Sequence, residues 1–159
     1  MATPSLAPET SLQIKRTFAA PVPTIFDAWT KPERLKKWFL MPNPGQESTI
    51  HEVDLRVGGK IRAEVQNKEG KTHRLLAVFK EIVPQQKLVY TWKWEEGMPD
   101  GGESLVTILF RQMGESNFTE VTLTHERFPN AKVRDQHNMG WNACLDGLER
   151  VIGETTAKH

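Results

Sequence analysis

Apolar residues in the last part of the chain recur with the period of an α-helix. The segment runs from Lys132 to about Thr155, and its large apolar residues, three or four positions apart, are Trp141, Leu145, Leu148 and Ile152. This spacing predicts a single amphipathic helix. Beside that face runs a line of small residues: Gly140, Ala143, Cys144 and Gly147. Glycine within a helix costs about 1 kcal/mol relative to alanine, so we expect either a closely approaching backbone or space for a ligand there.

Upstream of this helix the period of the apolar residues is mostly two, which predicts β-strands. The predicted strands are 11–18, 49–55, 60–66, 75–83, 88–94, 105–111 and 119–125. The dipeptide Gly58-Gly59 predicts a hairpin turn between the second and third of them. Hairpin-linked strands form antiparallel sheets.

Two short helices are predicted between the first and second strands. Pro21 and Pro23 suit the first turn of a helix, and the residues with helical spacing after them are Val22, Ile25, Phe26 and Trp29. Thr30 and Glu33 have the spacing of a capping box for the second helix. The fold class is therefore α+β, a curved antiparallel sheet wrapped around a long C-terminal helix. We expect a cavity between sheet and helix, open near the two short helices.

Composition indicates one ordinary globular domain. The chain has 159 residues, of which 38% are hydrophobic and 26% charged, and we expect a loose tail at 1–10 followed by a single domain over 11–159. A net charge of +1 provides no field to attract nucleic acid or an anionic membrane. No segment reaches the ~18 apolar residues of a membrane span, and the N-terminus lacks a secretory signal, so the expected compartment is the cytoplasm.

Residue types that carry catalytic or metal chemistry are sparse. Cys144 is the one cysteine, which excludes an intrachain disulfide and a cysteine cluster for a metal. Neighbouring residues on a strand point to opposite faces, so His51 with Glu52, or His125 with Glu126, cannot chelate as a pair. We therefore expect no metal, no cofactor and no catalytic residue. The pattern favours a non-catalytic protein without deciding the question.

Several stretches carry a family resemblance. They are IKRTFAAP at 14–21, FDAWTKPERLKKWF at 26–39, DLRVGGKIR at 54–62, KLVYTWKW at 87–94 and HNMGWNACLDGLERV at 137–151. In these stretches the chain resembles the START-like (SRPBCC, birch-pollen-allergen-like) superfamily, and within it bacterial proteins similar to the C-terminal domain of the activator of the 90-kDa heat-shock-protein ATPase. The resemblance implies a helix-grip fold with a mostly apolar internal cavity. It does not fix an activity, because this fold serves lipid carriers, hormone receptors, polyketide cyclases and co-chaperone domains.

The first functional hypothesis is binding of a small hydrophobic or amphipathic molecule between the sheet and the C-terminal helix. The candidate lining residues are Trp38, Phe39, Phe79, Tyr90, Trp92, Phe110, His125, His137, Gly140, Trp141 and Cys144. The aromatic side chains either line a pocket or fill the core, and the cysteine is equally consistent with an inert buried thiol. The two histidines are either a polar handle or acid–base pair for a ligand, or local hydrogen-bonding residues.

Two other classes of function remain open. A co-chaperone-like domain of the stress response would contact a chaperone, or another protein, through its surface, and this rests on the resemblance alone. A cyclase or hydrolase would use the cavity as a reaction vessel and needs convergent polar groups inside it. A monomer and a homodimer are both compatible with the sequence, because an exposed strand edge can pair with a second copy.

Overall fold

The computed structural model has the order of elements that the sequence predicts. It describes residues 10–40, 48–66, 70, 72–96, 103–115 and 117–157, with the backbone alone for 96 and 154–157. The expected tail at 1–10 lies outside these ranges apart from Thr10. The helices are α1 (Val22–Thr30), α2 (Pro32–Leu35) and α3 (Ala131–Ala157). The strands are β1 (Ser11–Phe18), β2 (Thr49–Val53), β3 (Lys60–Gln66), β4 (Thr72–Val83), β5 (Lys87–Glu96), β6 (Glu103–Gln112) and β7 (Thr119–Glu126).

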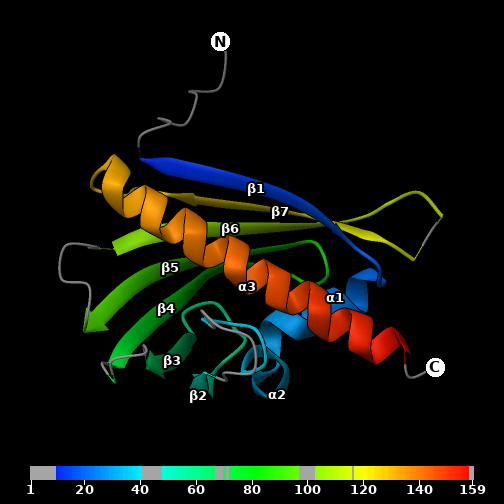
Figure 1. Cartoon of the computed structure of the whole chain (residues 1–159), viewed down its shortest axis with the longest axis horizontal. Coiled ribbons are helices and arrows are strands. Elements are labelled where there is room, and N and C mark those ends of the chain that lie inside the picture. Colours follow the sequence, from blue (N-terminus) through cyan, green and yellow to red (C-terminus); the bar gives the residue numbers. More distant parts are fainter. Residues whose placement is uncertain are drawn as a thin grey trace, which may run out of the picture.

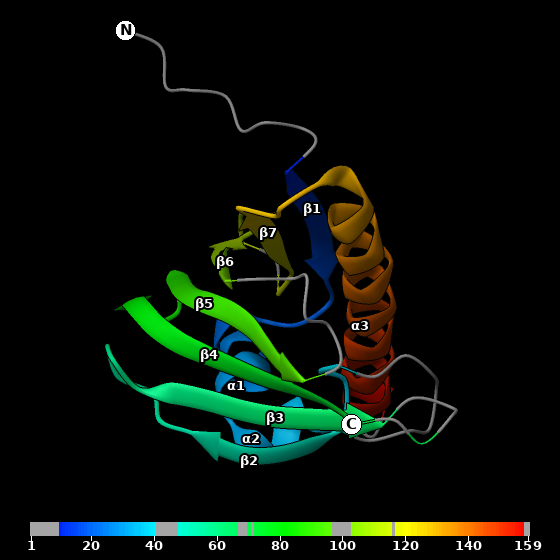
Figure 2. The same ribbon diagram turned by 90° about the vertical axis from the view of Figure 1, so that its left-hand side faces the viewer.

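The strands form one antiparallel sheet in the order β1-β7-β6-β5-β4-β3-β2. The first strand is thus an edge strand beside the last one, with Leu12 opposite His125. Two views show α3 running across one face of the curved sheet, with α1 and α2 near its C-terminal half (Figures 1 and 2). The predicted α+β class and the sheet wrapped around the C-terminal helix are confirmed.

Alternation along each strand decides which side chains face α3. On β5, Leu88, Tyr90 and Trp92 are buried on the inner face, whereas Lys93 points outward. Tyr90 lies opposite Phe79 on one neighbouring strand and opposite Val106 on the other. Cross-strand neighbours of this kind are the packing unit of a sheet, so apolar side chains make up most of the inner face around Tyr90.

The two short helices begin as predicted, but the capping box is wrong. Pro21 is the N-cap residue of α1. Thr30 still belongs to α1, and its hydroxyl donates to the carbonyl oxygen of Phe26 at 2.9 Å instead of capping α2. Lys31 is the N-cap of α2, in extended conformation, because the proline that follows it disfavours a helical backbone at the preceding residue.

The Gly58-Gly59 turn is confirmed and is fastened to the neighbouring strand. Gly58 has φ of +86°, and a β-carbon on Gly59 would overlap the carbonyl oxygen of Asp54. The amide of Gly58 donates to the carbonyl of Phe79 at 2.8 Å, and the amide of Phe79 donates to the carbonyl of Gly59 at 2.9 Å. Glycine is required at both positions, for the left-handed backbone and for the close approach.

The small-residue line of α3 is divided by its surroundings. Its large-residue neighbours, Trp141, Leu145, Leu148 and Ile152, are all buried as predicted. Gly140 is exposed, with nothing within 4 Å of an added β-carbon, so its placement at the wall of an internal cavity is wrong. Gly147 is buried, and its β-carbon position lies 3.7 Å from Cβ of Trp38. The chain after α2 covers that side of the helix at Gly147 and leaves it open at Gly140.

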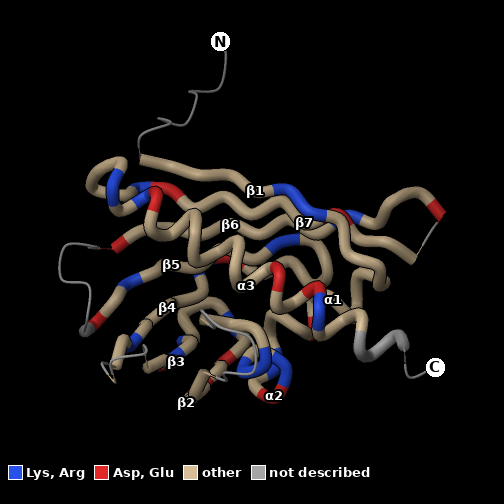
Figure 3. The backbone as a smooth tube through the Cα atoms, viewed as in Figure 1, with Lys and Arg blue, Asp and Glu red and all other residues tan. Residues whose placement is uncertain are grey.

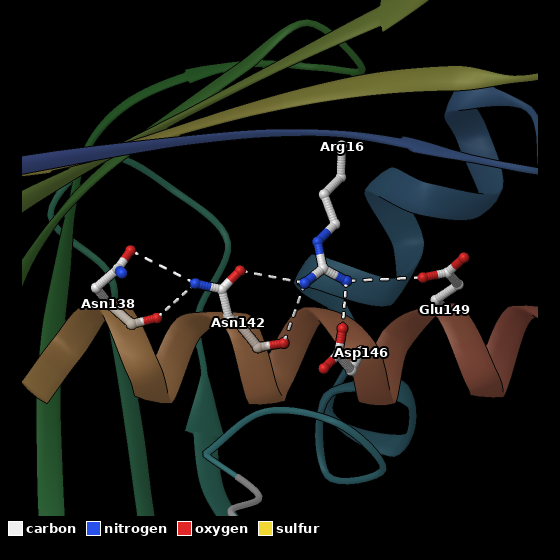
Figure 4. A network of polar contacts seen from close by, with 5 residues as sticks. All are labelled: Arg16, Asn138, Asn142, Asp146 and Glu149. Atoms are coloured by element: carbon white, nitrogen blue, oxygen red, sulfur yellow. Dashed lines mark hydrogen bonds and ion pairs between the residues drawn. The ribbon is translucent and has the colours of Figure 1, made fainter.

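Arg16 ties the edge strand β1 to the middle of α3. It lies on the inner face of β1, opposite Val121. Its guanidinium contacts Asp146 at 2.6 Å and Glu149 at 3.6 Å, and it donates to the backbone and side-chain oxygens of Asn142 at 3.3 and 3.2 Å (Figure 4). Several partners share one half-buried cation, which makes the contact more specific than an isolated surface ion pair.

We expect Arg16→Met to lower the free energy of unfolding by about 1–2 kcal/mol, because it removes an ion pair and the donors to Asn142 together. The matched control is Arg62→Met. Arg62 pairs with Glu52 at 3.3 Å, with both side chains 45% exposed, and we expect a loss below about 0.5 kcal/mol there. Urea denaturation measures both, and equal losses in the two variants would contradict the role given to Arg16.

The placement of Gly140 predicts a stabilising substitution. Gly140→Ala should raise the free energy of unfolding by about 0.5–1 kcal/mol, because alanine is the better helix former and the site is open. Gly58→Ala should lower it, because the left-handed backbone disfavours a side chain. Thermal and urea denaturation test both, and a loss of stability in Gly140→Ala would show that the site is more crowded than described.

Candidate functional site

Indole and imidazole rings gather where the first half of α3 crosses β5 and β7. We call this set the indole–imidazole cluster, and its members are Trp92, Trp94, His125, His137 and Trp141. Strand alternation turns Trp92 and His125 inward, and helical periodicity places His137 and Trp141 one turn apart on the buried face. Trp92, His125, His137 and Trp141 are all at least nine-tenths buried.

His125 is held as a neutral ring by two hydrogen bonds. The indole N–H of Trp141 donates to Nδ1 of His125 at 2.9 Å. Since an indole nitrogen only donates, Nδ1 carries no proton, and the ring proton lies on Nε2. Nε2 then donates to the hydroxyl of Ser104 at 2.6 Å, and that hydroxyl donates to the carbonyl oxygen of Trp92 at 3.3 Å. A chain of hydrogen bonds therefore runs from α3 through β7 and β6 to β5.

His137 is neutral for the same reason but in the other tautomer. The indole N–H of Trp94 donates to Nε2 of His137 at 3.0 Å. The proton therefore lies on Nδ1, which donates to the carbonyl oxygen of Val133 at 2.9 Å. The rings of His125 and His137 meet edge to face with centroids 5.3 Å apart, an approach that two imidazolium ions would oppose.

Burial lowers the pKa of both histidines. The pKa of His125 is far below its usual range because the ring is desolvated, and His137 nearby lowers it further. Desolvation also lowers the pKa of His137, although the hydrogen bond to Val133 partly opposes this. Both rings are therefore neutral near pH 7, in agreement with the tautomers that the tryptophans impose.

This arrangement does not prepare Ser104 for nucleophilic chemistry. A general base must accept the serine proton on an unprotonated imidazole nitrogen. Here Nε2 of His125 carries the proton and donates it to Ser104. Of the interpretations that the sequence left open, the geometry favours local hydrogen bonding by the histidines over an acid–base pair.

Trp92 lies at the centre of the cluster and has an unpaired polar atom. Its ring centroid is 5.0 Å from that of Trp141, 5.3 Å from that of His125 and 5.7 Å from that of Phe39. The side chain is 4% exposed, yet its Nε1 has no hydrogen-bond partner among the described residues. Leaving a buried donor unsatisfied costs about 1–3 kcal/mol, so the atom requires an explanation.

The other tryptophans show that this is exceptional. The chain has five tryptophans. The indole N–H of Trp29 donates to the hydroxyl of Tyr90 at 3.3 Å, and that of Trp38 donates to the carbonyl of Ala28 at 2.9 Å. With Trp94 and Trp141 bonded to the histidines, Trp92 is the one tryptophan whose N–H lacks an acceptor in the described structure.

The remaining predicted residues extend the same aromatic core without all reaching Trp92. Phe39 contacts both Trp92 and Trp141, and Phe79 packs edge-on against Tyr90. Burial raises the pKa of Tyr90, so its hydroxyl is neutral. Cys144 is a buried thiol.

Phe110 belongs to a different part of the core. Its ring packs against Phe26 and Trp29 of α1, with centroids 5.4 and 5.7 Å away. Its ring has no ring contact with a member of the cluster in the described part of the chain, and the exposed Gly140 lies outside the cluster as well.

Three residues in or beside the cluster were not among the predicted site residues: Ser104, Trp94 and Phe128. Ser104 shares the inward register of Val106 and Ile108, so a small polar residue at a buried position was a readable signal. Trp94 continues the inward series of β5. Phe128 lies in the turn before α3, with its ring centroid 4.3 Å from that of His125, and no periodic pattern marks it.

Among the described residues, no three side chains of His, Cys, Asp or Glu gather in a way that could hold a metal ion. No helix in the described part of the chain combines the length and apolar character needed to cross a membrane.

Comparison with known proteins decides the family. The profile of the family described as AHSA1, Activator of Hsp90 ATPase homolog 1-like protein, matches residues 19–153. The chain belongs to the AHSA1 family. No curated protein matches the sequence significantly.

Solved structures share the fold of this AHSA1 chain. A protein from Chromobacterium violaceum has a TM-score of 0.79 at 24% identity, with 90% of this chain and 96% of that chain covered. A protein from Nitrosomonas europaea has a TM-score of 0.74 at 27% identity, with 96% and 99% covered. The helix-grip fold that the sequence resemblance implied is therefore confirmed.

Because His125 and His137 are neutral in the folded protein, we expect the free energy of unfolding to fall in mild acid. Their folded pKa lies below the unfolded value of about 6.5, so below that pH the unfolded chain binds more protons. Stability is fully present above about pH 6.5 and falls below it, by up to about 1.4 kcal/mol per pH unit for each histidine. Urea denaturation at about pH 7.5 and about pH 5.5 measures the loss.

Glu64 also has a shifted pKa, but its effect on stability begins at a lower pH than that of the two histidines. The hydrogen bond with His51 is the main cause of the lowered pKa of Glu64. The contribution of Glu64 to the free energy of unfolding is lost only as the pH falls below the usual carboxyl pKa of 4.5. NMR titration of the imidazole resonances assigns the uptake of protons, and an unfolding free energy that stays constant down to about pH 5.5 would contradict the neutral pair.

Proposed function

We propose that this AHSA1-family protein binds a small, flat hydrophobic molecule that carries a hydrogen-bond acceptor, between β5 and α3. The observation that carries the proposal is the unpaired indole N–H of Trp92 inside an otherwise satisfied cluster. A ligand oxygen or nitrogen would accept from it and remove the cost of a buried unsatisfied donor. Surrounding aromatic rings would supply the apolar contact area.

The hydrogen-bonding chemistry of the cluster restricts the chemical class of the ligand. An indole can only donate, so the matching group is an acceptor such as a carbonyl. Both ring nitrogens of His125 and of His137 are already used within the protein, and both rings are neutral. A charged group would therefore lose its hydration without finding a counter-charge. A neutral aromatic or alicyclic ketone fits better than a carboxylate.

The surroundings hold Trp92 in place before any ligand arrives. Ser104 donates to its backbone carbonyl, and its ring has neighbours on β7, α3 and the segment after α2. A site that is ordered in advance loses less conformational entropy on binding. This supports binding rather than catalysis, because no group in the cluster is prepared to exchange a proton.

Two probes of matched shape test whether binding depends on a hydrogen-bond acceptor in the ligand. Fluorenone and fluorene have nearly the same shape, but only fluorenone has a carbonyl. We expect about tenfold tighter binding of fluorenone, the value of one buried hydrogen bond, measured by quenching of tryptophan fluorescence and by native mass spectrometry. In Trp92→Phe this preference should disappear.

The control variant is Trp141→Phe. It removes an indole donor that is already bonded and leaves Nδ1 of His125 without a partner, so it should lower the stability more than Trp92→Phe does, by about 1–3 kcal/mol. Equal affinity of the two probes for the wild type, or a preference that survives in Trp92→Phe, would refute the proposal.

A further inference from the structure

A groove lies between α1, α2 and the C-terminal half of α3, away from Trp92. Its volume is about 720 Å³, within the range of small-molecule sites. Its apolar lining consists of the buried Ala28, Trp38, Leu148 and Ile152 and of the more accessible Pro21 and Val151. The helices α1 and α2 lie beside the C-terminal half of α3 (Figures 1 and 2). An opening near the two short helices was expected, but the described lining of this groove comes from helices and adjoining turns rather than from strands.

The rim of the groove is basic. Arg34, Lys36 and Lys37 line it and are exposed, and Glu33 is the acidic residue in the described lining. None of these three cations has an ion pair with a described residue, whereas Lys31 in the preceding turn pairs with Asp27 at 3.6 Å. Figure 3 shows the basic positions in blue gathered around α2.

A fourth cation, Arg150, lies on α3 beside Gly147 and near the lining residues Leu148 and Val151 in the chain. Nη2 of Arg150 lies 3.5 Å from the β-carbon position of Gly147, and Cβ of Trp38 lies 3.7 Å from it. A larger side chain at Gly147 would displace one of the two. Arg150 has no ion pair among the described residues. The small residue thus leaves room both for this guanidinium and for the backbone of Trp38.

We propose that this groove is a second ligand site, which takes an amphipathic anion: a carboxylate with an unbranched apolar tail. The unpaired cations at the rim match the carboxylate, and the head group stays partly hydrated there, so its desolvation cost is small. The tail lies along Pro21 and Val151, the accessible apolar residues of the lining. Trp38 is fully buried, and its N–H is bonded to the carbonyl of Ala28. The two sites therefore select opposite ligands, a neutral acceptor at Trp92 and an anion here.

Decanoate and 1-decanol are the probes, with isothermal titration calorimetry as the measurement. We expect decanoate to bind at least about tenfold more tightly than the alcohol. Lys36→Glu/Lys37→Glu should abolish this difference and leave the alcohol unaffected. The matched control is Lys80→Glu/Lys93→Glu, an equal charge change at exposed positions of β4 and β5, which should retain the difference. Circular dichroism verifies that both variants fold.

The location is tested separately from the affinity. Decanoate should shift the backbone amide resonances of Lys36–Trp38 and of Gly147–Ile152, and Trp92→Phe should leave its affinity unchanged. That last result separates this site from the proposed function, so either can fail alone. The inference is overturned if decanoate gives neither heat nor shifts, if both charge variants lose affinity equally, or if the shifts centre on Trp92.

Discussion

Packing of α3 across the inner face of the sheet determines the geometry of both proposed sites. Polar contacts attach the helix to three strands: His137 accepts from Trp94 on β5, Trp141 donates to His125 on β7, and Asp146 pairs with Arg16 on β1. Because these attachments lie more than one turn apart, α3 cannot slide or rotate without breaking at least one. The same helix therefore borders two sites that differ in charge. The indole–imidazole cluster at its first half is neutral, and the groove at its C-terminal half is cationic.

Much of this arrangement follows from local patterns in the sequence. The period of two places Tyr90, Trp92 and His125 on the inner face, and the period of three to four places Trp141 and Leu148 on the buried face of α3. These patterns are strong because each element buries only one side. The order of the elements and the α+β class were predictable for that reason, and the resemblance supplied the helix-grip arrangement.

The remaining features depend on which neighbour a side chain meets. Gly140 and Gly147 look alike in the sequence, but only the second has Trp38 over it. The tautomers of the two histidines follow from which indole reaches which ring nitrogen, and no spacing encodes that. The unpaired N–H of Trp92 is visible only once all five tryptophans have been placed. The groove likewise exists only because α1 and α2 meet the C-terminal half of α3, although its rim cations lie close together in the sequence.

The position of β1 at the edge beside β7 also governs the order in which the chain can fold. Arg16 and Asn142 are 126 positions apart, so β1 has neither its strand partner nor its helix until almost the whole chain has been synthesised. Long-range pairing of this kind slows folding and leaves apolar strands exposed in the meantime. A charged residue within an apolar strand opposes its association with other chains. By this rule the two cations of β1, Lys15 and Arg16, disfavour pairing of this strand with other chains, and Arg16 also anchors α3 in the finished fold.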